Sequence, residues 1–564
     1  MCEALRVLYE VPACGNALFL AIKPNVKLKV LDDGHERFNY DESMRDALLR
    51  SAPPFEPPTE TLPDLGMPLS ENQSNVINGS WNVPLTLIQG PPGTGKTYTA
   101  VAIVKHWVRN KIRPLKQKGA LQKNEGRILV VADSNAAADN IRGHLERNGV
   151  ECYRVGRMTE SQGFDLSETV EHYLRGHPLI KEYKKAVELG HLRRLPTLRA
   201  QMDKIAVNRF SVIVGTCTGS GHPMLDGLTF DSVVIDECTQ ATEPATLVPL
   251  ARGAKRCVLL GDHKQLSATV CSTAAQNGGF SISLFERLLS SGGRLHMLDV
   301  QRRMHPSIAE FSNINFYDGR IGDAVGDRPE IPGLFWPSEG VQVCLVDTNT
   351  LTGGEARVGT SYCNRTEAKA VVDALVCAVE AGMDPKDIGV IVPYSGQKSQ
   401  IEKMLESEYR LSREQVRSVS VNTVDAFQGS EKELVLFSAV RSNREGDIGF
   451  TGDPRRMNVM LTRAKRGLVV FGDVKTLTAD PECDWSCWVH WARGKGCMVN
   501  TAEYFKKISA LKSGIKHGNG PMHETGKDAA GFRTFPADMW TRDIASRQER
   551  SSLGSKIFKR TNAR

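Results

Sequence analysis

An apolar, strand-like segment from Leu85 to Gln89 leads into a glycine-rich loop that ends in Lys96 and Thr97. Glycines let successive backbone N–H groups point inward at phosphate oxygens, and a following helix adds its positive N-terminal end. Lys96 would reach the β- and γ-phosphates, and Thr97 would hold Mg²⁺. The pattern predicts a nucleoside triphosphate site, although it fits kinases, motors, transporters and helicases equally. The predicted nucleotide-binding loop comprises Gly90, Pro91, Pro92, Gly93, Thr94, Gly95, Lys96, Thr97 and the following Tyr98.

Two further strand-like segments end in polar side chains that suit phosphoryl transfer to water. SVVIDE ends in Asp236 and Glu237, and CVLLGDHKQ carries Gln265. The reaction needs a residue that holds Mg²⁺, one that orients the attacking water, and groups that neutralise charge on the γ-phosphate. Asp236 suits the metal and Glu237 the water, whereas the uncharged amide of Gln265 can hydrogen-bond both the water and the γ-phosphate. Together with the glycine-rich loop, these residues predict a triphosphate hydrolysis site.

The segments that must position these residues alternate between strand-like and helix-like patterns. A first set of strand-like runs contains LTLI, RILVVA, SVIVGT, SVVIDE and CVLLGD, and a second contains VQVCLVD, IGVIVPY, VSVNTVDAF, LVLFSAVR and LVVFGD. This alternation is typical of parallel sheets covered by helices, which place their sites at the strand ends. The expected fold class is α/β, with two such units in tandem.

The length of 564 residues exceeds what one hydrophobic core supports, so several regions are expected. The charged stretch between the second and third strands has helical spacing and predicts a helical insertion. The last part of the chain is rich in Gly, Lys, Arg and Ser with few apolar residues, which predicts a basic, disordered tail. The expected regions are a proline-rich connector within 1–65, a first unit at 66–298 with its insertion at about 152–208, a second unit at 299–505, and the tail at 506–564.

Composition narrows the class of protein further. The net charge of +7 and a pI near 8.7 favour an acidic partner such as nucleic acid. The sequence has no apolar run of about 18 residues and no signal-like start, so we expect a soluble, unsecreted protein without a membrane partner. The 13 scattered cysteines are typical of reduced intracellular thiols.

Two clusters near the C-terminal end of the second unit allow alternative interpretations. One consists of Cys483, Cys487, His490 and Cys497, which could offer a zinc site but lacks a tight Cys-x-x-Cys pair on each side, so buried or free thiols are favoured. The other consists of Trp485, Trp488 and Trp491, which would share one helix face. Core packing is the favoured interpretation for the tryptophans, and a base-stacking platform is the alternative.

Several motifs occur in one order along the chain: LSENQ, GPPGTGKT, VVIDE, GDHKQL, QRRMHPSIAEF, VNTVDAFQGSEKE and DPRRMNVMLTRAKRG. Taken together they resemble the superfamily-one helicases. The similarity is greatest to the group that includes the up-frameshift RNA helicase of nonsense-mediated decay, senataxin and the immunoglobulin mu-binding protein. It covers roughly residues 40 to 500 and implies two tandem RecA-like P-loop domains.

The resemblance implies an ATP site whose charged groups come from both units. Gln73 would read the adenine edge, Arg302 would stack on the base where the family commonly has a tyrosine, and Glu431 would help hold the sugar. A guanidinium can also stack, so adenine binding is expected to persist with altered affinity. A cleft with charges from both units closes only around the triphosphate. The implied catalytic residues are Lys96, Asp236, Glu237, Gln265, Arg303 and Arg463, with Thr97 and Asp236 as ligands of Mg²⁺.

Nucleic acid would lie across both units, held through phosphate and sugar rather than base edges. Short hydroxyls and amides suit this role because they bond phosphates without reading sequence. Asp133 stands where the family usually has a proline, and its carboxylate could weaken binding. The implied contacts are Ser134, Asn135, Thr216, Thr218, Pro393, Tyr394 and Thr423.

The resemblance also carries expectations about function. We expect a monomeric, ATP-dependent RNA helicase or translocase that moves 5′ to 3′ on single-stranded RNA in RNA surveillance, with RNA-decay factors as partners. The expected location is the cytoplasm, with the nucleus as a second site. The alternatives are a DNA helicase and an ATP-gated clamp that remodels ribonucleoprotein without unwinding. The paired arginines and tandem units disfavour a P-loop kinase. Residues 1–65 are expected to include the end of the small β-barrel insertion found in the family.

Overall fold

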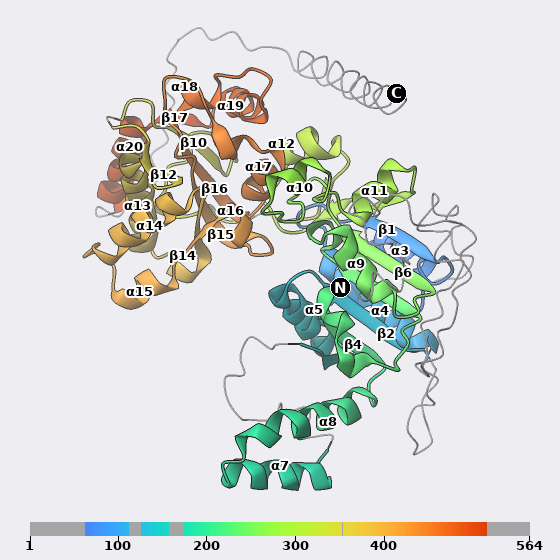
Figure 1. Cartoon of the computed structure of the whole chain (residues 1–564). Coiled ribbons are helices and arrows are strands. Elements are labelled where there is room, and N and C mark those ends of the chain that lie inside the picture. Colours follow the sequence, from blue (N-terminus) through green and yellow to red (C-terminus); the bar gives the residue numbers. More distant parts are fainter. Residues whose placement is uncertain are drawn as a thin grey trace. The chain divides into compact units, whose positions relative to one another are not determined.

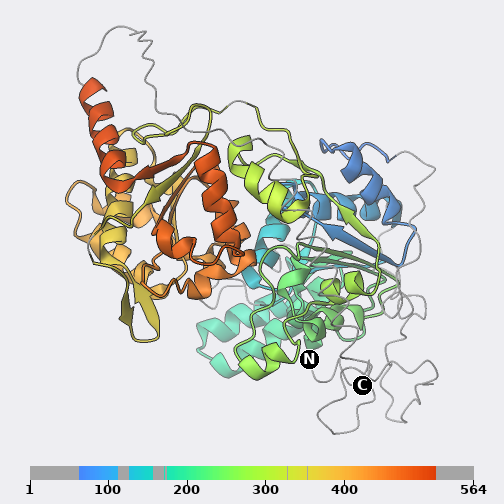
Figure 2. The same ribbon diagram turned by 90° about the horizontal axis from the view of Figure 1, so that it is seen from above.

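The computed structural model describes residues 62–111, 126–156, 171, 174–326, 328–351 and 353–515. Within these ranges the chain forms two large parallel β-sheets, each flanked by helices on both faces (Figures 1 and 2). The predicted α/β class with two tandem RecA-like units is therefore confirmed. Residues 1–61 and 516–564, which include most of the predicted connector and tail, lie outside the described residues.

The first sheet belongs to the first unit. Its strands are β1 (Leu85–Gln89), β2 (Ile128–Ala132), β3 (Tyr153–Arg154), β4 (Val212–Thr216), β5 (Ser232–Asp236), β6 (Arg256–Gly261) and β7 (Leu295–Met297). They are ordered β3-β4-β2-β5-β6-β1-β7. Successive side chains of a strand point to opposite faces, so Val131 enters one core and Val130 the other. This burial on both faces explains why the strands are continuous aliphatic runs.

Helices cover both faces of the first sheet. They are α3 (Glu71–Gly79), α4 (Lys96–Lys111), α5 (Asn135–Arg147), α7 (Pro178–Glu188), α8 (Leu195–Val207), α9 (Glu243–Leu250), α10 (Thr273–Asn277) and α11 (Leu284–Ser290). Helices α3, α4 and α5 share the core with Val130, whereas α8, α9 and α11 share the opposite core. The phosphate-loop helix α4 is thereby fixed against the sheet that carries Asp236.

The region predicted as a helical insertion, about 152–208, contains the helix pair α7 and α8 (Figure 1). Its start differs from the prediction, because Tyr153 and Arg154 form β3 and pair with β4. A strand of two residues is too short to give a periodic sequence signal. The Tyr153 hydroxyl donates to Asp203 of α8 at 2.9 Å, which connects the insertion to the sheet edge.

The second sheet belongs to the second unit and is also parallel. Its strands are β10 (Val343–Asp347), β13 (Ile388–Val392), β14 (Ser420–Thr423), β15 (Lys432–Ser438), β16 (Ala464–Gly472) and β17 (Met498–Asn500). They are ordered β14-β13-β15-β16-β10-β17. Short paired segments accompany it: β8 (Val300–Gln301) with β9 (Gly322–Asp323), and β11 (Ala356–Val358) with β12 (Ser361–Cys363).

The helices of the second unit again cover both faces of the sheet. They are α12 (Pro306–Tyr317), α13 (Arg365–Glu380), α14 (Ser395–Glu406), α15 (Arg413–Ser418), α16 (Val424–Phe427), α17 (Pro454–Leu461), α18 (Val474–Leu477), α19 (Asp484–Gly494) and α20 (Thr501–Ile515). Trp485, Trp488 and Trp491 of α19 are buried in the core that also holds residues of α12 and α17. Core packing is thus confirmed for the tryptophans, and the stacking-platform alternative is wrong.

The predicted start of the disordered tail at residue 506 is wrong for residues 506–515, which continue helix α20. Tyr504 and Ile508 lie one turn apart on this helix and are buried in the second unit's core. Two apolar residues at this spacing give one packed face, which is a weaker signal than the polar composition around them. Among the described residues, no helix is long and apolar enough to cross a membrane.

Candidate active site

The glycine-rich loop after β1 adopts the backbone that phosphate binding requires. Gly93 and Gly95 have φ angles of +77° and +78°, a region that side chains other than glycine rarely adopt. A Cβ atom on Gly93 would lie 2.8 Å from the Cβ of Arg303. The backbone N–H of Arg302 donates to the carbonyl of Gly93 at 2.9 Å. Arg303 can therefore lie beside the loop at Gly93 only because glycine has no side chain.

The predicted lysine, threonine and carboxylates come together at the ends of β1 and β5. The Lys96 ammonium pairs with Glu237 Oε2 at 2.7 Å, and the Thr97 hydroxyl donates to Asp236 Oδ2 at 2.8 Å. Glu237 has a φ of +52°, which is uncommon for a residue with a side chain. Backbone strain of this kind is found at functional sites. Gln240 donates to the same Glu237 oxygen at 2.8 Å.

The charges of this group shift one another's pKa values. Burial, and then the charge of Glu237, raise the pKa of Asp236 to about 6. Burial acts to raise the pKa of Glu237, but the charge and hydrogen bond of Lys96, together with the hydrogen bond from Gln240 and the charge of Arg463, lower it on balance. Burial acts against the ammonium of Lys96, yet Glu237 and Asp236 raise its pKa. The lysine and Glu237 thus form an ion pair, while Asp236 is held less firmly in its charged form.

Gln265 of the first unit meets Arg463 of the second. The Arg463 guanidinium donates from Nη2 to Gln265 Oε1 at 3.1 Å, across 198 residues of sequence. Gln265 Nε2 donates to Asp262 Oδ2 at 2.7 Å. Burial, and then the charge of Arg303, lower the pKa of Arg463 to about 9. The predicted γ-phosphate sensor and one predicted arginine are therefore already in contact and buried.

The second predicted arginine, Arg303, lies at the start of the second unit. Its side chain forms an ion pair with Glu431 and donates from Nη1 to the carbonyl of Thr462 at 3.2 Å. Lys465 also pairs with Glu431, at 2.9 Å. Burial acts to raise the pKa of Glu431, but the charges and hydrogen bonds of Arg303 and Lys465 together lower it. The structure thus brings Arg303 and Lys465 to the same carboxylate, Glu431.

The predicted adenine-reading residue, Gln73, is engaged with its own chain. Its Oε1 accepts from the N–H of Ser70 at 3.0 Å, and its Nε2 donates to the hydroxyl of Thr99 at 3.0 Å. Tyr98 lies partly buried on α4, and Arg302 is exposed. The role of these residues in base binding stays a prediction, because the Gln73 amide must release its present partners to read a base.

The residues predicted to contact nucleic acid follow strands β2 and β4 of the first unit and β13 and β14 of the second. Ser134 caps α5 by accepting from the N–H of Ala137 at 3.1 Å. Thr216 accepts from the N–H of Gly219 at 3.0 Å, while Thr218 is exposed. The exposed positions are Ser134, Asn135 and Thr218, the half-buried ones are Thr216, Tyr394 and Thr423, and Pro393 is buried.

Arg154 was not predicted to have a role, yet it orients one of these residues. Its guanidinium donates to Asn135 Oδ1 at 2.9 Å and pairs with Asp139 at 2.6 Å. A buried guanidinium fixed by two partners on α5 presents the Asn135 amide in one orientation. Sequence patterns gave no signal for it, because β3 is so short.

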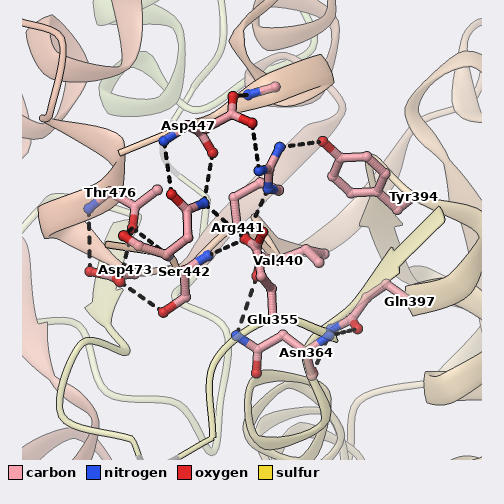
Figure 3. Close-up of polar contacts among 12 residues, drawn as sticks. Glu355, Asn364, Tyr394, Gln397, Val440, Arg441, Ser442, Asp447, Asp473 and Thr476 are labelled. Carbon is pink, nitrogen blue, oxygen red and sulfur yellow. Dashed lines mark hydrogen bonds and ion pairs between the residues drawn. The ribbon is translucent and has the colours of Figure 1, made fainter. Parts of the chain in front are cut away.

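A larger group of unpredicted residues surrounds Arg441, after β15 (Figure 3). Its guanidinium donates to Glu355 and to Asp447, each at 2.9 Å, and to the Tyr394 hydroxyl at 3.4 Å. It also lies over the ring of Tyr362, 4.5 Å from the centroid. Arg441 therefore contacts the hydroxyl of Tyr394, one of the residues predicted to bind nucleic acid. The available signal was a charged residue directly after a buried strand, in the run FSAVRSN.

The backbone beside Arg441 is strained. Val440 has a φ of +71°, which is a true outlier for a β-branched residue. Its N–H donates to Glu367 Oε1 at 2.8 Å, and its carbonyl accepts from Asn364 at 3.3 Å. Ser438 donates to the same Glu367 oxygen. Burial raises the pKa of Glu367 to about 7. These two residues at the start of α13 hold Val440 in a conformation that aims Arg441 at its partners.

The cluster weighed as a zinc site has other contacts. His490 Nδ1 lies 2.6 Å from the carbonyl of Ser486, and Cys497 is buried in the core with Trp491. Across the part of the chain that the structure describes, no group of three or more His, Cys, Asp or Glu side chains is placed to hold a metal ion.

Two family models match the chain, and both are described as an AAA domain. One matches residues 68–189 and 180–273, and the other matches residues 280–475. They cover the loops that carry Lys96 and Glu237 in the first unit and Arg303 and Arg463 in the second.

Named relatives are similar over most of this chain. Regulator of nonsense transcripts 1 from Dictyostelium discoideum is 35% identical over 76% of this chain and 32% of its own length. The ATP-dependent helicase upf1 of Schizosaccharomyces pombe is 34% identical, covering 79% and 49%. The ATP-dependent helicase NAM7 of Saccharomyces cerevisiae is 36% identical, covering 76% and 44%. The chain thus spans less than half the length of each.

Proposed function

The chain belongs to the superfamily-one helicases of the group that includes regulator of nonsense transcripts 1, and on this premise we propose that it is an ATP-dependent RNA helicase or translocase. It moves 5′ to 3′ on single-stranded RNA and acts as a monomer in nonsense-mediated decay or related RNA surveillance. Its partners are RNA-decay factors, and it works in the cytoplasm and also the nucleus.

One observation carries the proposal: hydrolytic residues of the first unit already touch arginines of the second. Gln265 and Arg463 lie 3.1 Å apart, and the backbone of Arg302 is bonded to the phosphate loop at Gly93. A nucleotide held between two units can drive motion, because binding and hydrolysis change how firmly they close. A kinase with a single P-loop unit does not require contacts between a γ-phosphate sensor in one unit and an arginine in another.

ATP would supply the phosphoanhydride bond that is broken, and Mg²⁺ would neutralise charge on its phosphates. Thr97 and Asp236 would hold the ion, and their 2.8 Å hydrogen bond places both oxygens on one side of the loop. Lys96 would leave Glu237 for the β- and γ-phosphates, and the freed carboxylate would orient the attacking water. Arg463 and Arg303 would turn to the γ-phosphate, where each neutralises developing charge.

The test is ATP hydrolysis with and without single-stranded RNA, in the wild type and in Lys96→Ala and Glu237→Gln. We expect strong stimulation of the wild type and near-complete loss of hydrolysis in both variants. An unchanged rate on adding nucleic acid would reject the translocase proposal. Lys264→Ala is a matched control, because it removes a lysine from the loop after β6 and leaves the Lys96–Glu237 pair intact.

Two further measurements separate the alternatives. Stimulation by single-stranded DNA equal to that by RNA would favour a DNA helicase, because it would mean that the protein does not depend on the 2′-hydroxyl. Hydrolysis without strand displacement would favour the ATP-gated clamp. Displacement of an RNA duplex with a 5′ overhang, but not one with a 3′ overhang, would support the proposed direction.

A further inference from the structure

A buried chain of hydrogen bonds joins the loop after β6 to helix α17 through Tyr317, the last residue of α12. The Tyr317 hydroxyl donates to Asp262 Oδ2 at 2.6 Å and accepts from Asn458 Nδ2 at 2.7 Å. All three side chains are at most 1% exposed. A carboxylate can only accept, so the direction of both bonds is fixed. The polar chain thus runs from α17 through Tyr317 to the first unit.

The same carboxylate also holds the γ-phosphate sensor. Asp262 Oδ2 accepts from Gln265 Nε2 at 2.7 Å, and Gln265 Oε1 accepts from Arg463 at 3.1 Å. Helix α17 carries Asn458 and ends at Leu461, two residues before Arg463. Two routes therefore connect the loop that carries Asp262 and Gln265, called the sensor loop, to α17. The direct route runs through Gln265 and Arg463, and the indirect route runs through Asp262 and Tyr317.

These two routes respond differently to a triphosphate. Gln265 and Arg463 are the residues that turn to the γ-phosphate, so the direct contact opens when nucleotide binds. Tyr317 and Asn458 have no part in phosphate binding, and the indirect contact can persist. A second bond supports it, because Asn458 Nδ2 also donates to the carbonyl of Lys264 at 2.8 Å. Helix α17 is thereby attached to the sensor loop at points that do not depend on Arg463.

A purely structural role is the simplest alternative, since buried tyrosine hydroxyls usually find partners. The placement of Tyr317 argues for more than this. Helix α12 packs into the core of the second unit, with Ile308 and Phe311 buried beside residues of α17. Asp262, in contrast, belongs to the first unit. The Tyr317 hydroxyl therefore joins the second unit to the first. It does so near Arg463, whose placement depends on the relative position of the two units.

We propose that Tyr317 is a positioning residue. It keeps α17, and with it Arg463, attached to the sensor loop while Arg463 and Gln265 separate from each other to contact the phosphate. The inference rests on the proposed function, because it assumes that the two units hydrolyse ATP between them. Tyr317 does not touch the nucleotide. It acts through the placement of Arg463, which stabilises charge during hydrolysis rather than in the bound state.

The test is Tyr317→Phe, which keeps the ring and removes both hydrogen bonds. We expect kcat for ATP hydrolysis to fall about tenfold, in keeping with the loss of one or two buried hydrogen bonds, with KM for ATP within twofold of wild type. We expect an effect on kcat and not on KM because the phosphate loop, which binds ATP, is unchanged, whereas Arg463 is positioned less accurately for hydrolysis. An ATP titration with and without RNA measures both quantities. A kcat within twofold of wild type, or a loss seen only in KM, would overturn the inference.

Tyr504→Phe is the matched control. Tyr504 is also fully buried, but its hydroxyl has no hydrogen-bond partner among the described residues. We expect its kcat to stay within twofold of wild type. If Tyr504→Phe lowered kcat as much as Tyr317→Phe, loss of a buried hydroxyl in general would explain the effect, and the inference would fail.

Asn458→Ala removes the same bond from the other side and replaces Tyr317→Phe as the test if that variant does not fold. In the double variant, kcat should be no more than about twofold lower than in the less active single variant. If the two effects were independent, the two fold-reductions in kcat would multiply. Multiplication would overturn the inference. If RNA did not stimulate hydrolysis by the wild type, the proposed function would fail but the inference about Tyr317 would not. The effect of Tyr317→Phe could still be measured on hydrolysis without RNA.

Discussion

The cleft around Lys96 and the cluster around Arg441 both gather carboxylates and guanidinium groups, but they use them differently. In the cleft, partners come from separate loops and are few: Lys96 meets Glu237, and Arg463 meets Gln265. In the cluster, Glu355 Oε2 alone accepts from Arg441, from the N–H of Ser442 and from the amide of Asn443. The first group can exchange partners for phosphate, whereas in the second one carboxylate oxygen is shared by three donors of its own chain.

This difference separates a candidate active site from a structural cluster of similar composition. A fully satisfied polar network makes a fold rigid, whereas loosely paired charges can rearrange around a ligand. The positive φ angle of Val440 lies in the Arg441 cluster, and that of Glu237 lies in the cleft around Lys96. Charge and burial alone would not have distinguished them.

The largest expected effect that tests this comparison is that of Arg463→Ala. We expect hydrolysis to fall by roughly 10³ to 10⁵ while nucleotide binding is largely retained, as for arginines that act on the transferring phosphoryl group. Single-turnover hydrolysis and nucleotide titration measure the two quantities. Arg466→Ala is the control, because Arg466 is half-buried and its guanidinium donates to the carbonyl of Pro329. Retained hydrolysis in Arg463→Ala would remove Arg463 from the site.

Arg441→Ala should show the opposite pattern. Removing this buried guanidinium leaves Glu355 and Asp447 without their shared partner, so we expect a loss of about 3 to 5 kcal/mol in the free energy of unfolding. Urea denaturation measures it. Arg444→Ala, at a nearby exposed position, should change stability by less than about 0.5 kcal/mol. If Arg441→Ala abolished hydrolysis without loss of stability, the division between the two clusters would be wrong.

Glu367→Gln tests the support beneath the Arg441 cluster. Because burial raises the pKa of Glu367 to about 7 in the folded protein, folding favours its protonated form. The wild type should therefore lose stability as pH rises from about 4.5 to 7, by an amount on the order of 3 kcal/mol. A glutamine side chain at this position cannot ionise, so Glu367→Gln should match the wild type near pH 5 and be more stable at pH 8.

Urea denaturation between pH 5 and 8 checks this expectation. Glu406→Gln changes an exposed carboxylate on α14, and its stability should follow the wild-type pH curve throughout. Parallel curves for the wild type and Glu367→Gln would show that Glu367 is charged in the fold, contrary to the expectation.

Arg302→Tyr should have the smallest effect. The backbone bond from residue 302 to Gly93 does not depend on the side chain, and an aromatic ring gives a larger, less polar stacking surface for a base. We expect KM for ATP to fall a fewfold, equivalent to about 1 kcal/mol, with kcat unchanged. ATP and GTP titrations measure the change and its base selectivity. A large change in kcat would mean that Arg302 shares the catalytic role of Arg303.

Much of the fold was predictable, because buried parallel strands are long aliphatic runs and the glycine-rich loop has a local pattern. The strands that were missed, β3, β7, β8, β9, β17 and the β11–β12 hairpin, have only two or three residues each. Such strands exist because neighbours pair with them, and periodicity cannot show that. The start of the tail was also misplaced, because Tyr504 and Ile508 anchor α20 despite its polar sequence.

The sequence by itself determined which loops carry phosphate and carboxylate chemistry, because a glycine with positive φ or a charge at a strand end is a local property. Only the tertiary structure decided which of those groups meet. The sheet places β1 beside β6, although β2 follows β1 along the chain, so the phosphate loop lies beside the loop of Gln265. The partners of Tyr317, Arg441 and Gln73 likewise depend on strand order and helix packing, since a hydrogen bond forms only between atoms that the whole fold brings within about 3 Å.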